Sequence, residues 1–336
     1  MSIPTTRLGR TGLTVSKLAL GTMTFGLQTD EAVSHRILDC AAEGGINFLD
    51  TADVYPLGGT VETAGRTEEI IGRWLRAKGS SRRADFIIAT KAANKVGPHS
   101  WDQGNSRKHL LDAIDASLER LQTDHVDLYQ LHHDDPHTPL DESLEALDVI
   151  VRSGRARYIG VSNFLSYRLA RAIGRAELRR LTQLVSVQPR YSLLFREIER
   201  ELLPLAAEEG LGVIPYNPLA GGLLTGKYKA EAKPGDNSRF TLGTAGAMYQ
   251  DRYWNDRSFA AVAQLQALAD EAGVALSTLA VAWVMANPLI TAPLLGASRP
   301  EQLDATLAAA EYVLDAGLKE KLDALTAEFR KGDAPR

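Results

Sequence analysis

The stretch Phe86-Ile87-Ile88-Ala89-Thr90-Lys91 is a short, mostly apolar run with β-branched residues that ends in a charged side chain. A segment with apolar residues at helical spacing follows over 107–120, and Val126-Asp127-Leu128-Tyr129-Gln130-Leu131 then repeats the strand pattern. A strand, a helix and a second strand in this order are typical of a parallel sheet built from βα units. The stretch therefore indicates an α/β protein, and the same pattern extends along the chain in both directions.

The alternation of strand and helix occurs eight times. The six other expected strands are 17–21, 46–50, 158–161, 184–188, 212–216 and 290–295. The expected helices lie near 31–43, 67–77, 107–120, 140–152, 166–179, 197–209, 258–272 and 300–310. Eight consecutive βα units over about 250 residues or more predict a closed (β/α)8 TIM barrel. Because no linker rich in Pro, Gly or Ser divides the chain, we expect a single domain over residues 1–336.

Two segments lie outside the eight units. Residues 6–15 alternate apolar and polar side chains around Gly9 and Gly12, which predicts an N-terminal β-hairpin that could plug the bottom of the barrel. Residues 217–257, after the seventh strand, are too many for a plain connection, and such long loops are usually functional or disordered. The Gly-x-Gly-x-x-Gly loop of a doubly wound dinucleotide-binding sheet is absent after the first strand, which favours the barrel.

The composition excludes several classes of protein. Of the 336 residues 44% are hydrophobic and 24% charged, as in an ordinary soluble globular protein, and the net charge of -4 gives no general attraction to nucleic acid or anionic lipid. Cys40 is the single cysteine, so an intramolecular disulfide is impossible. The start of the chain lacks the pattern of a signal peptide, and the most apolar stretch, 276–286, is too short to span a bilayer. We therefore expect a cytoplasmic protein, and the sequence carries no indication of its oligomeric state.

Three neighbouring strands end in reactive side chains. Asp50, Lys91 and His132 follow or end the second, third and fourth expected strands, and Tyr55 lies five residues beyond Asp50. Active sites of such barrels lie at the carboxyl ends of the strands, and neighbouring strands are about 4.8 Å apart. The four side chains are therefore expected to converge on one small volume.

These four groups suit proton donation to a carbonyl. Free tyrosine has a pKa near 10, and a buried ammonium beside it would lower that pKa and make Tyr55 a better acid. Lys91 would supply this charge, and Asp50 would keep Lys91 protonated and in place. His132 would donate a hydrogen bond to the substrate oxygen.

The same residues also suit two other chemistries. Lys91 alone would also suit the Schiff-base lysine of a barrel aldolase, although that role leaves Tyr55 without a function. His132 and His133 resemble a metal-binding pair, but adjacent side chains on a strand point to opposite faces, so both reach the interior only if the strand has already ended. We therefore expect no metal site.

Several motifs agree in order and spacing with a known family. They are Asp50-Thr51-Ala52-Asp53-Val54-Tyr55, Thr90-Lys91, Leu131-His132, Gly160-Val161-Ser162-Asn163-Phe164 and Tyr216-Asn217-Pro218-Leu219-Ala220-Gly221-Gly222. Together they resemble the aldo-keto reductase family, and the resemblance runs from about residue 6 to about residue 310. It implies that Asp50, Tyr55, Lys91 and His132 form a catalytic tetrad with Tyr55 as the general acid. It also implies NADPH-dependent reduction of an aldehyde or ketone, with NADP(H) extended across the barrel mouth.

The resemblance further implies the residues that bind the cofactor. In the family Ser162, Asn163 and Gln188 correspond to positions that bind the nicotinamide carboxamide, and Tyr216 to the aromatic residue that stacks on the nicotinamide. The full set of expected cofactor-binding residues is Gly21, Thr22, Met23, Asp50, Ser162, Asn163, Gln188, Tyr216, Asn217, Pro218, Leu219, Gly221, Lys227, Gly296, Ser298, Arg299 and Gln302.

The segment Gly296-Ala297-Ser298-Arg299-Pro300-Glu301-Gln302 follows the eighth strand and is expected to open a helix. Free backbone N–H groups at that helix start, together with Ser298 and Arg299, would suit the adenosine 2′-phosphate of NADPH. Two features depart from the family pattern. Ala305 and Thr306 replace a Glu-Asn pair that contacts adenine in many members, which predicts weaker cofactor binding, and the insertion 56–66 is expected to widen or roof the pocket beside Tyr55.

The substrate is the least determined part of the prediction. Five residues are expected in the substrate pocket: Phe25, Trp101, His133, Tyr191 and Trp254. Further candidates for its wall are Met23, Phe164, Phe240, Tyr249 and Tyr253. Aromatic walls favour a substrate with an apolar body, such as a bulky ketone or a xenobiotic carbonyl, while a sugar stays an alternative. Some members of the family serve as NADPH-binding, redox-sensing subunits of ion channels with slow turnover, which is a second possible function.

Overall fold

Eight parallel strands form one curled sheet in the computed structural model of the chain, which describes residues 3–77, 80–236 and 238–330. The remaining residues of the expected domain 1–336 lie outside the described part. The strands are β3 (Ala19–Gly21), β4 (Phe48–Asp50), β5 (Ile87–Ala92), β6 (Val126–Leu131), β7 (Ala156–Ser162), β8 (Leu184–Gln188), β9 (Gly212–Val213) and β10 (Leu294–Leu295). Their order is β10-β3-β4-β5-β6-β7-β8-β9. Backbone bonds from Thr291 N to Val213 O and from Leu294 N to Pro215 O, both 2.8 Å, join the two edges. The predicted (β/α)8 fold is confirmed.

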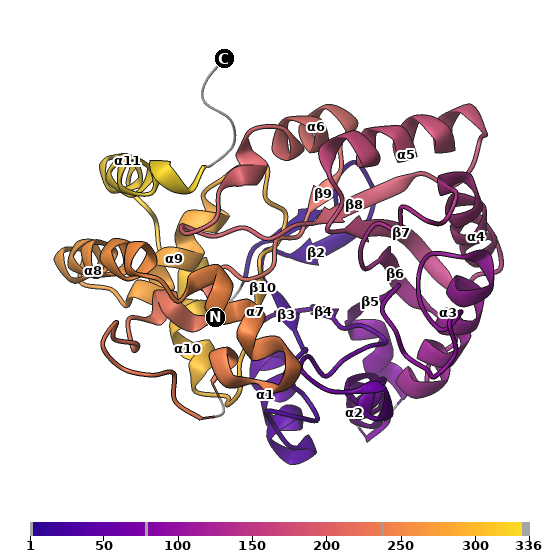
Figure 1. Cartoon of the computed structure of the whole chain (residues 1–336), viewed down its shortest axis with the longest axis horizontal. Coiled ribbons are helices and arrows are strands. Elements are labelled where there is room, and N and C mark those ends of the chain that lie inside the picture. The colour runs from indigo at the N-terminus through magenta and orange to yellow at the C-terminus, as the bar shows by residue number, and fades with distance from the viewer. Residues whose placement is uncertain (1–2, 78–79, 237, 331–336) are drawn as a thin grey trace.

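Helices surround the strands on the outside (Figure 1). Those that follow a strand are α1 (Glu31–Glu43), α2 (Arg66–Ala77), α3 (Arg107–Leu121), α4 (Leu140–Arg152), α5 (Ser166–Leu178), α6 (Leu202–Glu209), α8 (Asp256–Glu271) and α10 (Gln302–Leu307). Side-chain caps explain several of their starts, because an oxygen of Asp30, Ser106 or Asn255 accepts from an otherwise unpaired backbone N–H. Short 3-10 turns are η1 (Val61–Thr63), η2 (Ser80–Asp85), η3 (Glu197–Glu199), η4 (Ala220–Thr225), η5 (Arg239–Thr241), η6 (Gly243–Ala245), η7 (Ala308–Ala310) and η8 (Ala327–Phe329).

The structure differs from the helix prediction in several places. The expected helix 197–209 is divided into η3 and α6, and three further helices are present: α7 (Gly246–Tyr253), α9 (Leu276–Met285) and α11 (Ala316–Leu325). Every residue from Leu276 to Val284 is buried, so α9 has no polar face and shows no amphipathic period. Among the described residues, no single helix has the length and apolar character needed to cross a membrane. In this part of the chain, only α8 and α9 taken together meet that test, and they are bent by 93° relative to each other.

The predicted hairpin is confirmed, and it covers one end of the barrel. Strand β1 (Thr5–Arg7) pairs antiparallel with β2 (Thr14–Ser16), and Leu8 between them is fully buried in a cluster with Phe48, Leu128 and Ile214. Gly9 has a φ of +56°, and a Cβ there would lie 2.4 Å from the carbonyl oxygen of Gly210. Because Gly210 precedes β9, the hairpin closes the amino ends of the strands, and their carboxyl ends are left to form the site.

Candidate active site

A cavity of about 1210 Å³ lies at the carboxyl ends of the strands. All seventeen residues expected to bind the cofactor line it, as do Tyr55, His132 and His133. Residues 56–61 of the insertion also line the cavity, beside Tyr55 as expected. The carbonyl oxygen of Gly58 accepts from Thr244 N at 3.2 Å, so the insertion is fastened to the long loop after β9. The cavity is therefore bounded by two loops as well as by the strand ends.

Asp50 and Lys91 form a buried ion pair beneath the cavity. The Lys91 Nζ lies 2.5 Å from Asp50 Oδ1 and 2.7 Å from the carbonyl oxygen of Thr51, and the two charged side chains are 0% and 3% exposed. Gln130 and Gln188 donate to the other Asp50 oxygen at 3.2 and 2.8 Å. Donors from three strands therefore fix Asp50, and Asp50 in turn compensates the ammonium. Lys91 does not line the cavity itself.

Tyr55 lies directly above this pair. The Lys91 Nζ is 5.1 Å from the centre of its ring, and the His132 ring packs edge-on at 5.6 Å between centroids. Burial raises the pKa of the Tyr55 phenol well above its usual range, and the Asp50 charge adds to the rise. The expected lowering of this pKa is therefore wrong, because desolvation by burial is the largest effect and the Asp50 charge acts in the same direction. The phenol is held firmly in its protonated form.

His132 follows β6 and is buried beside the same cation. Burial lowers the pKa of its imidazole well below the usual range, and the Lys91 charge lowers it further. The ring is therefore neutral, with one N–H and one bare nitrogen. Its Nδ1 is buried and has no hydrogen-bond partner among the described residues. Because β6 ends at Leu131, His133 also reaches the cavity, and its Nδ1 contacts the carbonyl oxygen of Asp134 at 2.8 Å.

Polar groups at or after the carboxyl ends of β7, β8 and β9 form a hydrogen-bonded set on the cavity wall. The Tyr216 hydroxyl donates to Asn163 Oδ1 at 2.7 Å, and Asn163 Nδ2 donates to the carbonyl of His132 and to Ser162 Oγ. Asn163 has a φ of +56°, a left-handed conformation uncommon for a residue other than glycine. Gln188 uses its amide nitrogen on Asp50, which fixes the direction of its carbonyl oxygen.

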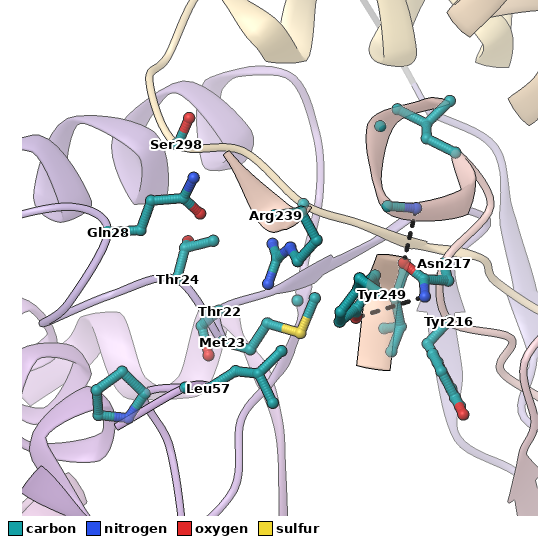
Figure 2. A pocket seen from close by; sticks show the side chains of 18 of the residues that line it. Thr22, Met23, Thr24, Gln28, Leu57, Tyr216, Asn217, Arg239, Tyr249 and Ser298 are labelled. Atoms are coloured by element: carbon teal, nitrogen blue, oxygen red, sulfur yellow. Dashed lines mark hydrogen bonds between the residues drawn. The ribbon is translucent and has the colours of Figure 1, made fainter. Parts of the chain in front are cut away.

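The loop after β9 begins with an ordered turn. Asn217, also left-handed at a φ of 64°, accepts from Gly221 N at 3.3 Å and contacts the Tyr249 hydroxyl at 3.4 Å, as the dashed lines in Figure 2 show. Lys227 further along lies on the cavity wall, and desolvation, together with the nearby Arg299 charge, lowers its pKa. Two cations that repel each other therefore lie on one stretch of cavity wall.

The segment before α10 differs from the expectation. The helix begins at Gln302 and has six residues, and the Ser298 N–H is already taken by Gln302 Oε1 at 2.8 Å. One of the backbone N–H groups expected to be free, that of Ser298, is therefore capped by a side chain, and binding of the 2′-phosphate by this segment stays a prediction. The Arg299 guanidinium is 68% exposed, and its contact with the Glu301 carboxylate is long, at 4.0 Å. It therefore stays available on the cavity wall.

Four of the five residues expected in the substrate pocket lie elsewhere. Phe25 is fully buried in the core, and Trp101 is half-exposed and stacked on His99. Tyr191 borders a separate, smaller cavity, where its hydroxyl donates to a carboxylate, and Trp254 packs among other aromatic rings. Only His133 lines the cavity. Of the further candidates, Met23 and Tyr249 line it, whereas Phe164, Phe240 and Tyr253 are buried outside it.

Two arginines of the long loop were missed by the sequence reasoning. Arg239 and Arg252 line the cavity with their guanidinium carbons 5.5 and 5.9 Å from the centre of the Tyr249 ring. In Figure 2 Arg239 points into the space between Tyr249 and the segment with Thr22 and Met23. Arg239 Nη1 is buried and has no hydrogen-bond partner among the described residues. Both arginines flank aromatic residues in the sequence, but only the fold of the loop brings them to the cavity.

A comparison with known protein families identifies the family of this chain. The family model described as "Aldo/keto reductase family" matches residues 17–327. The chain belongs to the aldo/keto reductase family. This confirms the resemblance found in the sequence, and the match continues past residue 310, where the resemblance was expected to end.

The proteins similar to this aldo/keto reductase have names that describe different functions. It is 45% identical to the uncharacterized oxidoreductase YrpG of Bacillus subtilis, over 92% of each chain. It is 38% identical to a probable voltage-gated potassium channel subunit beta of Arabidopsis thaliana, over 91% of this chain and 90% of the relative. It is 33% identical to a putative aryl-alcohol dehydrogenase of Schizosaccharomyces pombe, over 91% of each. The family and these relatives support an oxidoreductase that acts on carbonyl compounds.

In the described ranges of this aldo/keto reductase, no group of three or more His, Cys, Asp or Glu side chains is arranged to hold a metal ion. The two adjacent histidines after β6 therefore have no third partner of that kind in the described chain.

Proposed function

We propose that the protein is an NADPH-dependent reductase that converts an aldehyde or ketone to an alcohol, with Tyr55 as the general acid. The observation that carries the proposal is the convergence of Tyr55, His132 and the buried Asp50–Lys91 pair at one end of the large cavity. Carbonyl reduction needs a proton donor held against the substrate oxygen, and this cluster presents a protonated phenol and a neutral imidazole there.

The cavity wall fits an extended dinucleotide. Gln188 and Asn163 would hold the carboxamide, because both line the cavity together with Tyr216, and Gln188 keeps its carbonyl oxygen as an acceptor while its amide nitrogen bonds Asp50. Lys227 and Arg239 would hold the diphosphate, and the buried Arg239 Nη1 without a partner supports an anion there. Arg299 would hold the 2′-phosphate. When bound, the reduced nicotinamide supplies the hydride for the carbonyl carbon.

The protein's own groups would handle the proton. The neutral His132 ring donates a hydrogen bond that polarises the substrate carbonyl, and Tyr55 Oη gives its proton to the carbonyl oxygen as that oxygen gains charge. The Lys91 ammonium, held by Asp50 and Thr51, stabilises the phenolate left behind. Because burial raises the pKa of the Tyr55 phenol, the proton transfer depends on this stabilisation.

The direction of the two pKa shifts predicts the pH dependence of reduction. His132, with its pKa lowered by burial, stays neutral, and Tyr55, with its pKa raised, stays protonated from about pH 6 to about pH 9. We therefore expect kcat for a saturating aldehyde to be nearly constant across this range. Stopped-flow or steady-state rates against pH check this. A fall in kcat as the pH rises, with its midpoint near the ordinary pKa of histidine, would contradict a neutral His132 imidazole.

Arg299 is expected to set the choice of cofactor. A charge-assisted contact to the 2′-phosphate contributes about 1.5 kcal/mol or more, so Arg299→Ala should weaken NADPH binding about tenfold or more. NADH binding should change little, because NADH lacks that phosphate, and the salt dependence of NADPH binding should become flatter. Fluorescence titrations with both cofactors measure this. An equal loss for both would show that Arg299 supports the loop or the shared diphosphate.

A second function, a cofactor-binding regulatory subunit, is favoured by one observation. A relative 38% identical over 91% of the chain is named as a probable channel subunit. Both functions are compatible with the same catalytic geometry, and a measurement of turnover distinguishes them. The aldolase alternative is not supported, because Lys91 is fully buried, paired with Asp50 and absent from the cavity wall.

The test of the proposed function is a fluorescence titration with NADPH followed by rate measurements on aldehydes, bulky ketones and sugars. We expect NADPH binding and substrate-dependent loss of NADPH absorbance with at least one carbonyl class. Tight NADPH binding with negligible turnover across the panel would favour the regulatory subunit. Absence of NADPH binding would refute both functions.

A further inference from the structure

Helix α7 places a cation on the cavity wall that no expected function uses. Met248, Tyr249 and Arg252 lie on the same face of this helix, and all three line the cavity. Of the charges around Tyr216, that of Arg252 acts most strongly against the rise that burial causes in the pKa of this phenol. Arg252 therefore lies near the aromatic part of the wall, where Tyr216 and Tyr249 meet.

Arg252 has no counter-ion in the described part of the chain. Its guanidinium lies 5.9 Å from the centre of the Tyr249 ring, the outer limit of a cation–π contact, and no described carboxylate or other acceptor is within bonding distance. Two other arginines near this loop differ. Arg190 lies directly on the Phe195 ring at 3.5 Å, and Arg257 forms an ion pair with Glu328.

A half-buried arginine without a counter-ion favours the binding of an anion that enters the cavity. A guanidinium is always protonated, and a half-buried one without a partner loses hydration that a carboxylate or phosphate would replace. The diphosphate and the 2′-phosphate of the cofactor are assigned to Lys227, Arg239 and Arg299. Arg252 therefore has no cofactor phosphate left to bind, and its position beside Tyr216 and Tyr249 points to the substrate.

We propose that Arg252 binds an anionic group carried by the carbonyl substrate, a carboxylate or a phosphate. This rests on the proposed reductase function, and it gives that function a substrate class: carbonyl compounds with one anionic end. The planar guanidinium offers two parallel N–H donors, which match two oxygens of either anion. Arg252 is in this role a specificity-determining residue and takes no part in the proton transfer.

The test compares three aldehydes that differ in one substituent: 4-carboxybenzaldehyde, 4-formylphenyl phosphate and the neutral methyl 4-formylbenzoate. We expect Arg252→Gln to lower kcat/KM for at least one anionic aldehyde about tenfold or more, mainly through KM, and to leave the neutral ester nearly unchanged. The carboxylate and phosphate arms show which anion is preferred. Arg252→Lys should recover part of the loss, since it keeps the charge and loses the paired donors.

A matched control is Arg171→Gln, which removes the same charge from the exposed outer face of α5. It should leave all three substrates unaffected. Equal losses on charged and neutral aldehydes, or no loss on either anionic one, would overturn the proposal while leaving the reductase function intact.

A binding measurement separates the two proposals if turnover is absent. Calorimetry with 4-(hydroxymethyl)benzoate and 4-(hydroxymethyl)phenyl phosphate, with and without NADP+, should show binding of at least one anion that Arg252→Gln weakens about tenfold. Such binding without turnover would refute the reductase function alone. If the wild-type chain and the Arg252→Gln variant bind both anions equally, the role of Arg252 is refuted.

Discussion

Replacement of Tyr55 by phenylalanine is expected to lower kcat by about two orders of magnitude or more, because it removes the only proton proposed to reach the carbonyl oxygen. The ring itself should stay in place, since it packs against His132 and lies over Lys91. NADPH affinity should therefore be nearly unchanged. The measurement is single-turnover reduction with saturating NADPH, together with a cofactor titration of the variant.

The control for this variant is Tyr249→Phe, which removes another hydroxyl from the same cavity. That hydroxyl has only a long contact of 3.4 Å with Asn217, so we expect a small effect on kcat. Tyr55→Phe with kcat close to that of the wild type would mean that another group delivers the proton. His132 is then the nearest alternative donor.

Replacement of Lys91 by methionine is the other change with a large expected effect. The ammonium is proposed to stabilise the Tyr55 phenolate, and without it Asp50 alone would face the phenol and raise its pKa further. Reduction should therefore fall below detection. The variant also leaves the Asp50 charge buried and unpaired, which costs about 3–5 kcal/mol of stability in comparable sites. Chemical denaturation and steady-state rates measure the two effects separately.

A double variant distinguishes lost chemistry from lost folding. Lys91→Met combined with Asp50→Asn removes both charges, so the free energy of unfolding should recover much of its loss while activity stays absent. Recovery of activity in the double variant would show that Lys91 serves only to neutralise Asp50. Trapping of a carbonyl compound on wild-type Lys91 by borohydride would favour Schiff-base chemistry instead.

The regular parts of the fold could be read from the sequence because their signals are local. Strands β6 and β8 and helices α1 and α4 have the expected bounds, because a short apolar run or apolar residues at helical spacing can be recognised within each segment. Helix α9 was missed for the opposite reason: it is buried all round, and a uniformly apolar segment has no period to detect.

The candidate site also has residues that were predictable from the sequence and residues that were not. Residues at strand ends, such as Asp50 and Lys91, were predictable because a parallel barrel brings all carboxyl ends to one face. The aromatic residues expected in the substrate pocket were mostly misplaced, because nothing local says whether Tyr191 or Trp254 packs in the core or faces a cavity. Their positions depend on the path of irregular loops.

The sequence by itself determined the alternating βα pattern, the family and the chemical identity of the groups at the strand ends. The tertiary structure decided their environment. Asp50 and Gln188, 138 positions apart, meet only because the sheet curls, and the burial that raises the pKa of Tyr55 exists only in the closed barrel. It also decided that Arg239 and Arg252 reach the cavity, through a loop whose path has no periodic signal. Spacing along the chain fixes local structure, whereas desolvation and charge pairing arise from long-range contacts.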